Sequence, residues 1–276
     1  MDIFSNLQVI GECLLDEDRT LAYLRAIRLS VSDGSVVLDA GTGSGIFALA
    51  AAQAGAKRVY AVEIAPDLLP IACTNFAAND VLNILLTHQD MRNIQVHEPL
   101  DVVIAEMFDT GMIAEHQCQA MNQLHTIGAI KESTIFIPSS ITSLVALVEY
   151  DFNFYGFNMP FVIQARNDGA SKRILTCLSD YMPYESVSFS HPIPEYVNNR
   201  VNVPIERSGT ANAVILCSEL SLPGESALRH TTDMNMPVVI PIEPTAVESG
   251  AVWGVRISYS RGHGFTNVAI ELGHSE

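Results

Sequence analysis

The chain has 276 residues and a formal net charge of −16, because 31 aspartates and glutamates stand against 15 lysines and arginines. That balance disfavours a nucleic-acid partner, since phosphate binding draws on basic patches, and it is compatible with a cationic substrate. No apolar run approaches the roughly 18–20 residues of a membrane span, and the first residues lack the pattern of a signal peptide. Five scattered cysteines without a close Cys-x-x-Cys pair predict neither a metal site nor a disulfide framework. We therefore expect a cytoplasmic protein without a nucleic-acid or membrane partner.

Residues 1–30 form the first predicted segment, a helical lead-in. Leu21, Leu24 and Ile27 recur near helical spacing, and acids at 16–18 supply negative charge near a helix start. Arg19 follows these acids directly. Taken alone, it is as readily a solvated surface charge as part of a site.

A glycine-rich turn follows between a predicted strand and a helix. The apolar run 36–38 predicts a buried parallel strand, which ends in Asp39 and leads into Gly41-Thr42-Gly43-Ser44-Gly45. These glycines let the backbone turn sharply and let a ligand approach closely. One helix later, the strand predicted at 58–63 ends in Glu63. An acid at that place can accept hydrogen bonds from both hydroxyls of a ribose.

This pattern resembles motif I of the class I S-adenosyl-L-methionine (SAM) methyltransferases more than a NAD fingerprint. The spacing is Gly-x-Gly-x-Gly, and the acid comes two residues before the first glycine. The resemblance implies that the turn surrounds the methionine part of SAM and that Glu63 holds its ribose. It also implies an adenine contact from Asp90, which is nearly as readily an ordinary loop acid. The implied cofactor residues of this part are Asp39, Gly41, Thr42, Gly43, Gly45, Glu63, Ile64, Asp90 and Met91.

Predicted strands and helices alternate from residue 36 to 138, which indicates βαβ units and a parallel sheet. The predicted strands are 35–39, 58–63, 83–88, 101–106 and 132–137, and the predicted helices are 45–54, 66–79 and 112–127. Asp39, Glu63, Asp90 and Glu106 lie at or just beyond the carboxyl ends of strands, where the ligands of such sheets bind. One crevice could gather all four.

After residue 138, β-rich runs separated by Pro, Gly, Ser and Asn replace helical periodicity. These runs are 141–150, 174–178, 213–220, 238–242, 252–260 and 267–272. We therefore predict an α/β fold with two domains. A Rossmann-like, SAM-binding parallel-sheet methyltransferase domain spans 31–138, and an antiparallel β-barrel or sandwich that serves the acceptor spans 139–276.

Glu106 ends the fourth predicted strand, and Glu115 follows nine residues later. On a continuous helix this spacing would place the two side chains about 180° apart. The intervening Asp109-Thr110-Gly111 favours a turn instead, which could aim both carboxylates at one point. Two convergent carboxylates suit a guanidinium, which is planar and carries five donors. On spacing alone, a helix-starting acid and an exposed helix acid explain the pair equally well.

With this segment the chain resembles the protein arginine methyltransferase family, whose double-E loop carries two glutamates nine positions apart. The runs 14–20, 54–59, 135–138 and 155–159 also resemble that family in order, so the likeness covers about residues 12–160 well and the remainder weakly. The resemblance implies that Glu106 and Glu115 hold the acceptor nitrogen group. It implies that Arg19 contacts the SAM carboxylate and orients Glu106.

The resemblance further implies that Asp16 pairs with a loop histidine, for which His230 is the best candidate. The family has Thr-His-Trp at that place, whereas this chain has Arg229-His230-Thr231. His230 is therefore as readily an ordinary surface or core histidine.

Departures from the family narrow the expected acceptor. The N-terminal lid helix is cut to a few residues, the dimerisation arm is shortened, and Ile10 and Cys13 replace a histidine and a methionine. We therefore predict a SAM-dependent N-methyltransferase for a guanidino or other cationic nitrogen group of a small molecule or short peptide, with a homodimer left open. The alternatives are a protein arginine methyltransferase, an enzyme for another amine or a hydroxyl with Glu106 as base, and a non-catalytic interaction protein with a SAM fold.

Overall fold

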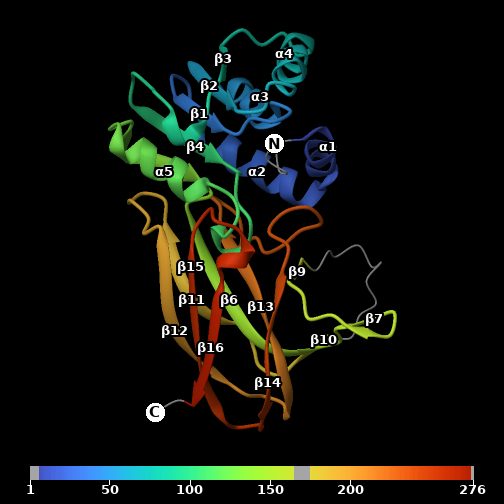
Figure 1. Ribbon diagram of the computed structural model, residues 1–276. Coiled ribbons are helices and arrows are strands. Elements are labelled where there is room, and N and C mark those ends of the chain that lie inside the picture. Colours follow the sequence, from blue (N-terminus) through green and yellow to red (C-terminus); the bar gives the residue numbers. More distant parts are fainter. Residues whose placement is uncertain (1–5, 165–174, 275–276) are drawn as a thin grey trace.

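Two helices precede the first strand in the structure, a computed structural model that describes residues 6–164 and 175–274 (Figure 1). They are α1 (Leu7–Leu15) and α2 (Glu17–Ser30). The chain bends between them at Asp16, whose carboxylate accepts a hydrogen bond from the Arg19 backbone N–H at 3.2 Å and so caps α2. The predicted helical lead-in is thus two helices with a buried acid at their junction.

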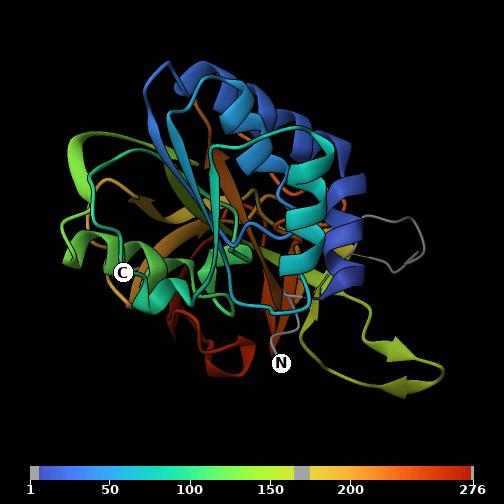
Figure 2. The same cartoon turned by 90° about the horizontal axis from the view of Figure 1, so that it is seen from above.

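A five-stranded parallel sheet follows, in the order β3-β2-β1-β4-β5. The order reverses between β1 and β4, which makes the carboxyl ends of these two strands the expected ligand position. Figure 2 shows α2 and α3 on one side of this sheet and α5 on the other. The elements are β1 (Val36–Ala40), α3 (Ile46–Gln53), β2 (Arg58–Glu63), α4 (Leu69–Ala78), β3 (Ile84–His88), β4 (Leu100–Ala105), α5 (Gln117–Thr126) and β5 (Ile130–Ile137).

The rest of the chain, strands β6 to β16, is antiparallel and is here called the β-domain (Figure 1). One sheet has the order β10-β6-β13-β14-β9, with β11 also paired to β6, and a second has the order β12-β15-β16. Valines and isoleucines from both sheets share one buried core, as expected for strands with one apolar face. The strands are β6 (Ser140–Tyr150), β7 (Asn153–Phe154), β8 (Phe157–Asn158), β9 (Ile163–Gln164), β10 (Leu175–Cys177), β11 (Met182–Ser188), β12 (Tyr196–Pro204), β13 (Gly209–Ser221), β14 (Val238–Val247), β15 (Val252–Ser260) and β16 (Ala269–His274).

The predicted fold class is confirmed, with corrections to single elements. The prediction of one helix over 112–127 is wrong at its start, because Gly111 and Met112 have φ values of 69° and 55°, which no α-helix accommodates. A short 3₁₀ turn, η2 (Thr110–Met112), stands there, and α5 begins only at residue 117. Strands β11 and β12 were not predicted, because proline in both, and asparagine in β12, are uncommon in strands. Of the predicted strand 174–178, residue 174 lies outside the described residues.

Among the described residues, no helix combines the length and the apolar character that crossing a membrane requires.

Candidate active site

A cavity of about 380 Å³ lies where the parallel strands end. Its walls come from the chain just after β1, β2, β3 and β4, from α1, and from the loop before β14. All predicted cofactor residues except Gly45 line it, and so does Glu115. The sheet edge therefore brings together the two glutamates and all the predicted cofactor residues other than Gly45.

The glycine-rich turn is tied to the acids at the ends of β1 and β2. The Gly43 N–H donates to one carboxylate oxygen of Glu63 at 2.9 Å, and the Ala65 N–H donates to the other at 2.8 Å. The Thr42 hydroxyl donates to Asp39 at 2.6 Å. Burial raises the pKa of Asp39 to about 6, against the opposite effect of this hydrogen bond. Two buried carboxylates thus stand beside backbone that a ligand can approach.

The prediction of Gly45 as a cofactor residue needs correction, because Gly45 does not line the cavity in the described structure. It caps the start of α3 with a φ of 85°, and a Cβ there would lie 2.4 Å from the Phe76 ring. This glycine is needed for the close packing of α3 on α4.

After β3, Asp90 and Met91 line the cavity at the start of a 3₁₀ turn, η1 (Met91–Asn93). Arg92 donates to both oxygens of the Asp90 carboxylate, at 3.0 and 2.6 Å. This side-chain pairing lowers the pKa of Asp90, so the group is a carboxylate near neutral pH.

Arg19 is buried and forms an ion pair with Glu106. A second N–H of its guanidinium donates to the Cys13 carbonyl at 3.3 Å, and the group lies 5.2 Å from the centre of the Phe47 ring. Its Nε is buried without a hydrogen-bond partner among the described residues. The surface-charge interpretation of Arg19 is therefore wrong, and one buried donor of its guanidinium remains to be satisfied.

The segment 106–115, here called the glutamate loop, turns back on itself. Asp109 is buried, and its carboxylate accepts hydrogen bonds from the backbone N–H groups of Ala114 and Glu115, each at 3.0 Å. The Met107 N–H donates to the Gln117 side chain at 3.0 Å. These bonds replace the helical pattern, and the loop brings Glu106 and Glu115 to one cavity. The helix-acid interpretation of the pair is therefore wrong.

The implied pairing of Asp16 with His230 does not form in the described structure. Asp16 instead accepts hydrogen bonds from the Thr231 hydroxyl and, at 2.9 Å, from the Asp233 backbone N–H. Neither Asp16 nor His230 lines the cavity. Burial and the neighbouring Arg229 lower the pKa of His230, which is therefore neutral near pH 7. Asp16 thus connects α2 to the loop before β14. The side chain that it binds is that of Thr231, the residue after the predicted partner His230.

Sequence reasoning missed the rest of that loop, 222–237. Asp233, Asn235 and Met236 line the cavity from it. Their only sequence signal is their nearness to His230, since no periodicity or spacing connects them to the sheet edge.

Comparisons with known proteins were made for the whole chain. A family model of ribosomal protein L11 methyltransferase (PrmA) matches residues 18–143. The uncharacterized protein MJ1452 of Methanocaldococcus jannaschii is 32% identical over 94% of this chain and 95% of its own length. An arginine N(omega)-methyltransferase of Streptomyces achromogenes subsp. streptozoticus is 26% identical over 90% of this chain and 74% of its own length. The Trypanosoma brucei PRMT1 enzyme-prozyme heterotetrameric complex with AdoHcy has a similar fold, with a TM-score of 0.80, 16% identity, and coverage of 100% of this chain and 96% of that one.

The fold, the glycine-rich turn and these similarities define a class I SAM-dependent methyltransferase that resembles the protein arginine methyltransferases. The predicted class and cofactor are confirmed. Within that class, the chain belongs to the same family as MJ1452, which it matches over nearly the full length of both proteins.

Replacing Arg19 with lysine should weaken SAM binding and methyl transfer although the positive charge is kept. The planar guanidinium of arginine can pair with Glu106 through one edge and donate to a second carboxylate, such as that of SAM, through another. Lysine has no such planar group. Isothermal titration with SAM and initial-rate measurements check this expectation. Arg25→Lys on the same helix is the matched control, because Arg25 is half-exposed and its ion pair with Glu225 lies at the surface. Equal SAM affinity and turnover in both variants would contradict a role for Arg19.

Proposed function

We propose that this enzyme transfers a methyl group from SAM to a guanidino nitrogen of a small molecule or short peptide. The observation that carries the proposal is the glutamate loop, which presents Glu106 and Glu115 to the cavity that the glycine-rich turn also lines. The name of the Streptomyces relative states an omega nitrogen of arginine as the methylated position, which supports a guanidine acceptor.

The residues present fit SAM. The glycine-rich turn lines the cavity with backbone, and the space beside Gly43 is tight, since a Cβ there would lie 3.0 Å from the Ile10 side chain at the cavity wall. Arg19 has an unsatisfied buried N–H for the carboxylate of SAM, and Glu63 has a buried carboxylate for its ribose hydroxyls. Asp39 with the turn would hold the methionine part, and Asp90 with Met91 the adenine. SAM supplies the methyl group on a positively charged sulfur.

The two glutamates position the acceptor. Each carboxylate can accept two N–H groups of a planar guanidinium, which fixes the orientation of the nitrogen to be methylated. Their negative charge offsets the repulsion between two cations in one cavity. The ion pair with Arg19 keeps Glu106 in place before an acceptor arrives. Methylation releases one proton from the attacked nitrogen, and these same carboxylates are the nearest candidate acceptors.

Two departures from the arginine methyltransferase pattern support a small acceptor. Helix α1 contributes Ile10 and Cys13 to the cavity wall, at positions where the family resemblance implies a histidine and a methionine. The hairpin β7–β8 has two residues in each strand. The cavity wall therefore differs from that of the family, and the short hairpin offers little surface to a long polypeptide.

Methyl-labelled SAM with a panel of acceptors should put label into small guanidines. The panel contains free arginine, agmatine, a short arginine peptide, an arginine-rich protein and, as the matched amine without a guanidine, lysine. We expect labelled arginine, agmatine or peptide, with lysine unlabelled, and mass spectrometry of the product to place the methyl group on a guanidino nitrogen. Label in the large protein alone would contradict the small-acceptor proposal. Tight SAM binding without label in any guanidine would favour a non-catalytic role.

A further inference from the structure

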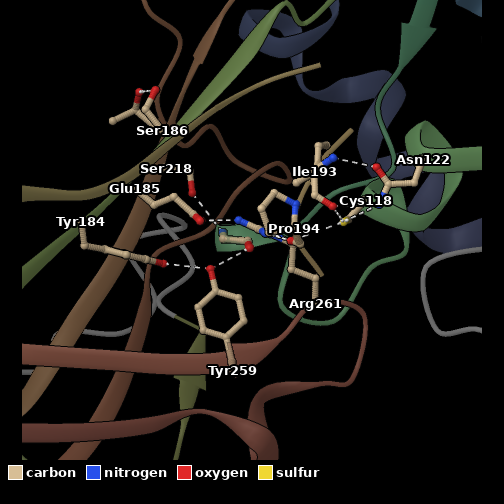
Figure 3. Close-up of polar contacts among 12 residues, drawn as sticks. Cys118, Asn122, Tyr184, Glu185, Ser186, Ile193, Pro194, Ser218, Tyr259 and Arg261 are labelled. Atoms are coloured by element: carbon tan, nitrogen blue, oxygen red, sulfur yellow. Dashed lines mark hydrogen bonds and ion pairs between the residues drawn. The ribbon is translucent and has the colours of Figure 1, made fainter. Parts of the chain in front are cut away.

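The β-domain holds the turn of the glutamate loop through side chains that lie outside the cavity (Figure 3). The Gly111 N–H donates to the Ser218 hydroxyl of β13 at 3.0 Å. The Gly111 carbonyl accepts a hydrogen bond from the Tyr259 hydroxyl of β15 at 2.9 Å. Both polar groups of the central residue of this loop are therefore bonded to the β-domain.

The neighbouring backbone is held from the same side. The carbonyls of Met112 and Ile113 accept hydrogen bonds from the N–H groups of Gly262 and Gly264, at 3.2 and 2.9 Å. The Thr110 hydroxyl donates to the Met236 carbonyl at 2.7 Å. Four consecutive residues at the turn are thus fixed by contacts from a distant part of the chain.

Tyr259 is itself held in place. Its hydroxyl lies 3.2 Å from that of Tyr184 on β11, and both rings are buried (Figure 3). Because the Tyr259 proton goes to Gly111, Tyr184 donates to the Tyr259 oxygen. Burial raises the pKa of Tyr184 to about 12 and that of Tyr259 well above its usual value, so both remain donors near neutral pH.

A buried arginine fixes the segment that follows Tyr259. Arg261 is fully buried and forms an ion pair with Glu185 and a hydrogen bond to the Pro194 carbonyl (Figure 3). Its own carbonyl accepts a hydrogen bond from the Gln119 side chain of α5 at 2.7 Å. The end of β15 is therefore joined to the helix that directly follows the glutamate loop.

We propose that Tyr259 and Ser218 are positioning residues for methyl transfer, because they fix Gly111 and thereby set where Glu115 lies relative to Glu106. The catalytic part of this inference rests on the proposed function. Glu106 directly follows β4 and is held by Arg19, on the near side of the turn. Glu115 lies beyond Gly111 and Met112, two residues with positive φ, and its position depends on how that turn is held.

The absence of a side chain at Gly111 allows the two tyrosine hydroxyls to lie close to the loop backbone. A Cβ at that position would lie 2.8 Å from the Tyr259 hydroxyl and 3.1 Å from that of Tyr184. A side chain there would push the two hydroxyls away from the loop backbone. The glycine therefore permits the close approach on which the hydrogen bond depends.

Tyr259→Phe removes the donor and keeps the ring. We expect kcat to fall roughly ten- to a hundredfold, as for a misplaced catalytic group. The Kd for SAM should stay close to that of the wild type, and the Tm should fall modestly, because the buried Gly111 carbonyl loses its donor. Amide hydrogen exchange should become faster in the peptide that covers residues 106–115 and stay unchanged in the peptide that covers β1 and β2. Tyr196→Phe, at an exposed tyrosine of β12, is the matched control and should change neither kcat nor the exchange of residues 106–115.

A double-variant cycle separates positioning from general loss of stability. Gly111→Ala should lower kcat strongly, and Gly111→Ala with Tyr259→Phe should lose less than the product of the two single effects, because the second change removes the atom that the Cβ would strike. Gly250→Ala is the control for backbone strain, since Gly250 has a φ of 86° and open space around it. If the fold-loss in kcat of the double variant equals the product of the two single fold-losses, the proposed contact is contradicted.

The exchange measurement keeps the two proposals apart. If the wild type methylates no guanidine, the proposed function fails, and faster exchange of residues 106–115 in Tyr259→Phe still shows that the tyrosine holds the loop. If the wild type methylates guanidines and Tyr259→Phe keeps wild-type kcat, the positioning role is overturned whatever the exchange rates are.

Discussion

Glu115→Gln should bind SAM nearly as the wild type does and should lose methyl transfer by roughly a hundredfold to several thousandfold, the range that corresponds to breaking a buried ion pair. Removing one of two carboxylates leaves the charge of a bound guanidinium under-compensated. The Glu115 variant is the sharper of the two possible tests, because Glu106 also forms the ion pair with Arg19. Initial rates with a labelled methyl donor and a SAM titration measure the two effects separately.

Glu106→Gln should also lose methyl transfer heavily, and the double variant should lose less than the two single effects combined, since both residues act on one group. Glu132→Gln, at an exposed glutamate of β5, is the control for loss of one negative charge. If Glu115→Gln keeps activity within a few-fold of the wild type, Glu106 acts as a lone base, and the main reason for a guanidine acceptor disappears.

Gly43→Val should abolish SAM binding at concentrations that saturate the wild type. Gly43 has a φ of 52° and lines the cavity, so a valine both strains the backbone and fills space that the ligand needs. The Gly43 N–H also donates to Glu63, and a shift of the turn would break that bond at the carboxylate assigned to the ribose. Isothermal titration with SAM is the direct measurement.

Gly128→Val is the matched control for the cost of a β-branched residue at positive φ. Gly128 has a φ of 70° and nothing near its Cβ position, in an exposed turn after α5. The control should lose thermal stability and keep its SAM affinity. Wild-type SAM affinity in Gly43→Val would contradict the placement of SAM beside this turn.

The part of the site that the sequence predicts well is local. The turn at 41–45 needs glycines at positive φ, and each acid after a strand is placed by the strand itself, so spacing along the chain is sufficient. The two glutamates are nine residues apart, and the turn residues between them already favour convergence over a helix. The start of α5 was predicted five residues too early, because side-chain patterns do not show the hydrogen bonds of the buried Asp109.

The part that the sequence does not predict is held by contacts across the chain. Hydrogen bonds to Asp16 hold the loop before β14 beside the cavity, and no local pattern in that loop marks the residues that form them. The resemblance placed the partner at His230, whereas the structure uses Thr231, a one-residue difference that only the path of the loop decides. Tyr259 and Ser218 look like ordinary strand residues in the sequence, and their bonds to Gly111 appear only once two domains are packed together.

The bonds from Asp16 to the loop before β14 also determine when the cavity is completed during protein synthesis. Asp16 and Thr231 are separated by 215 positions. At about 5–20 residues per second, a ribosome takes roughly 10–40 s to make the chain between them. The parallel sheet and its glycine-rich turn are therefore made well before one wall of the cavity, and a nascent chain that ends before residue 231 still lacks that wall.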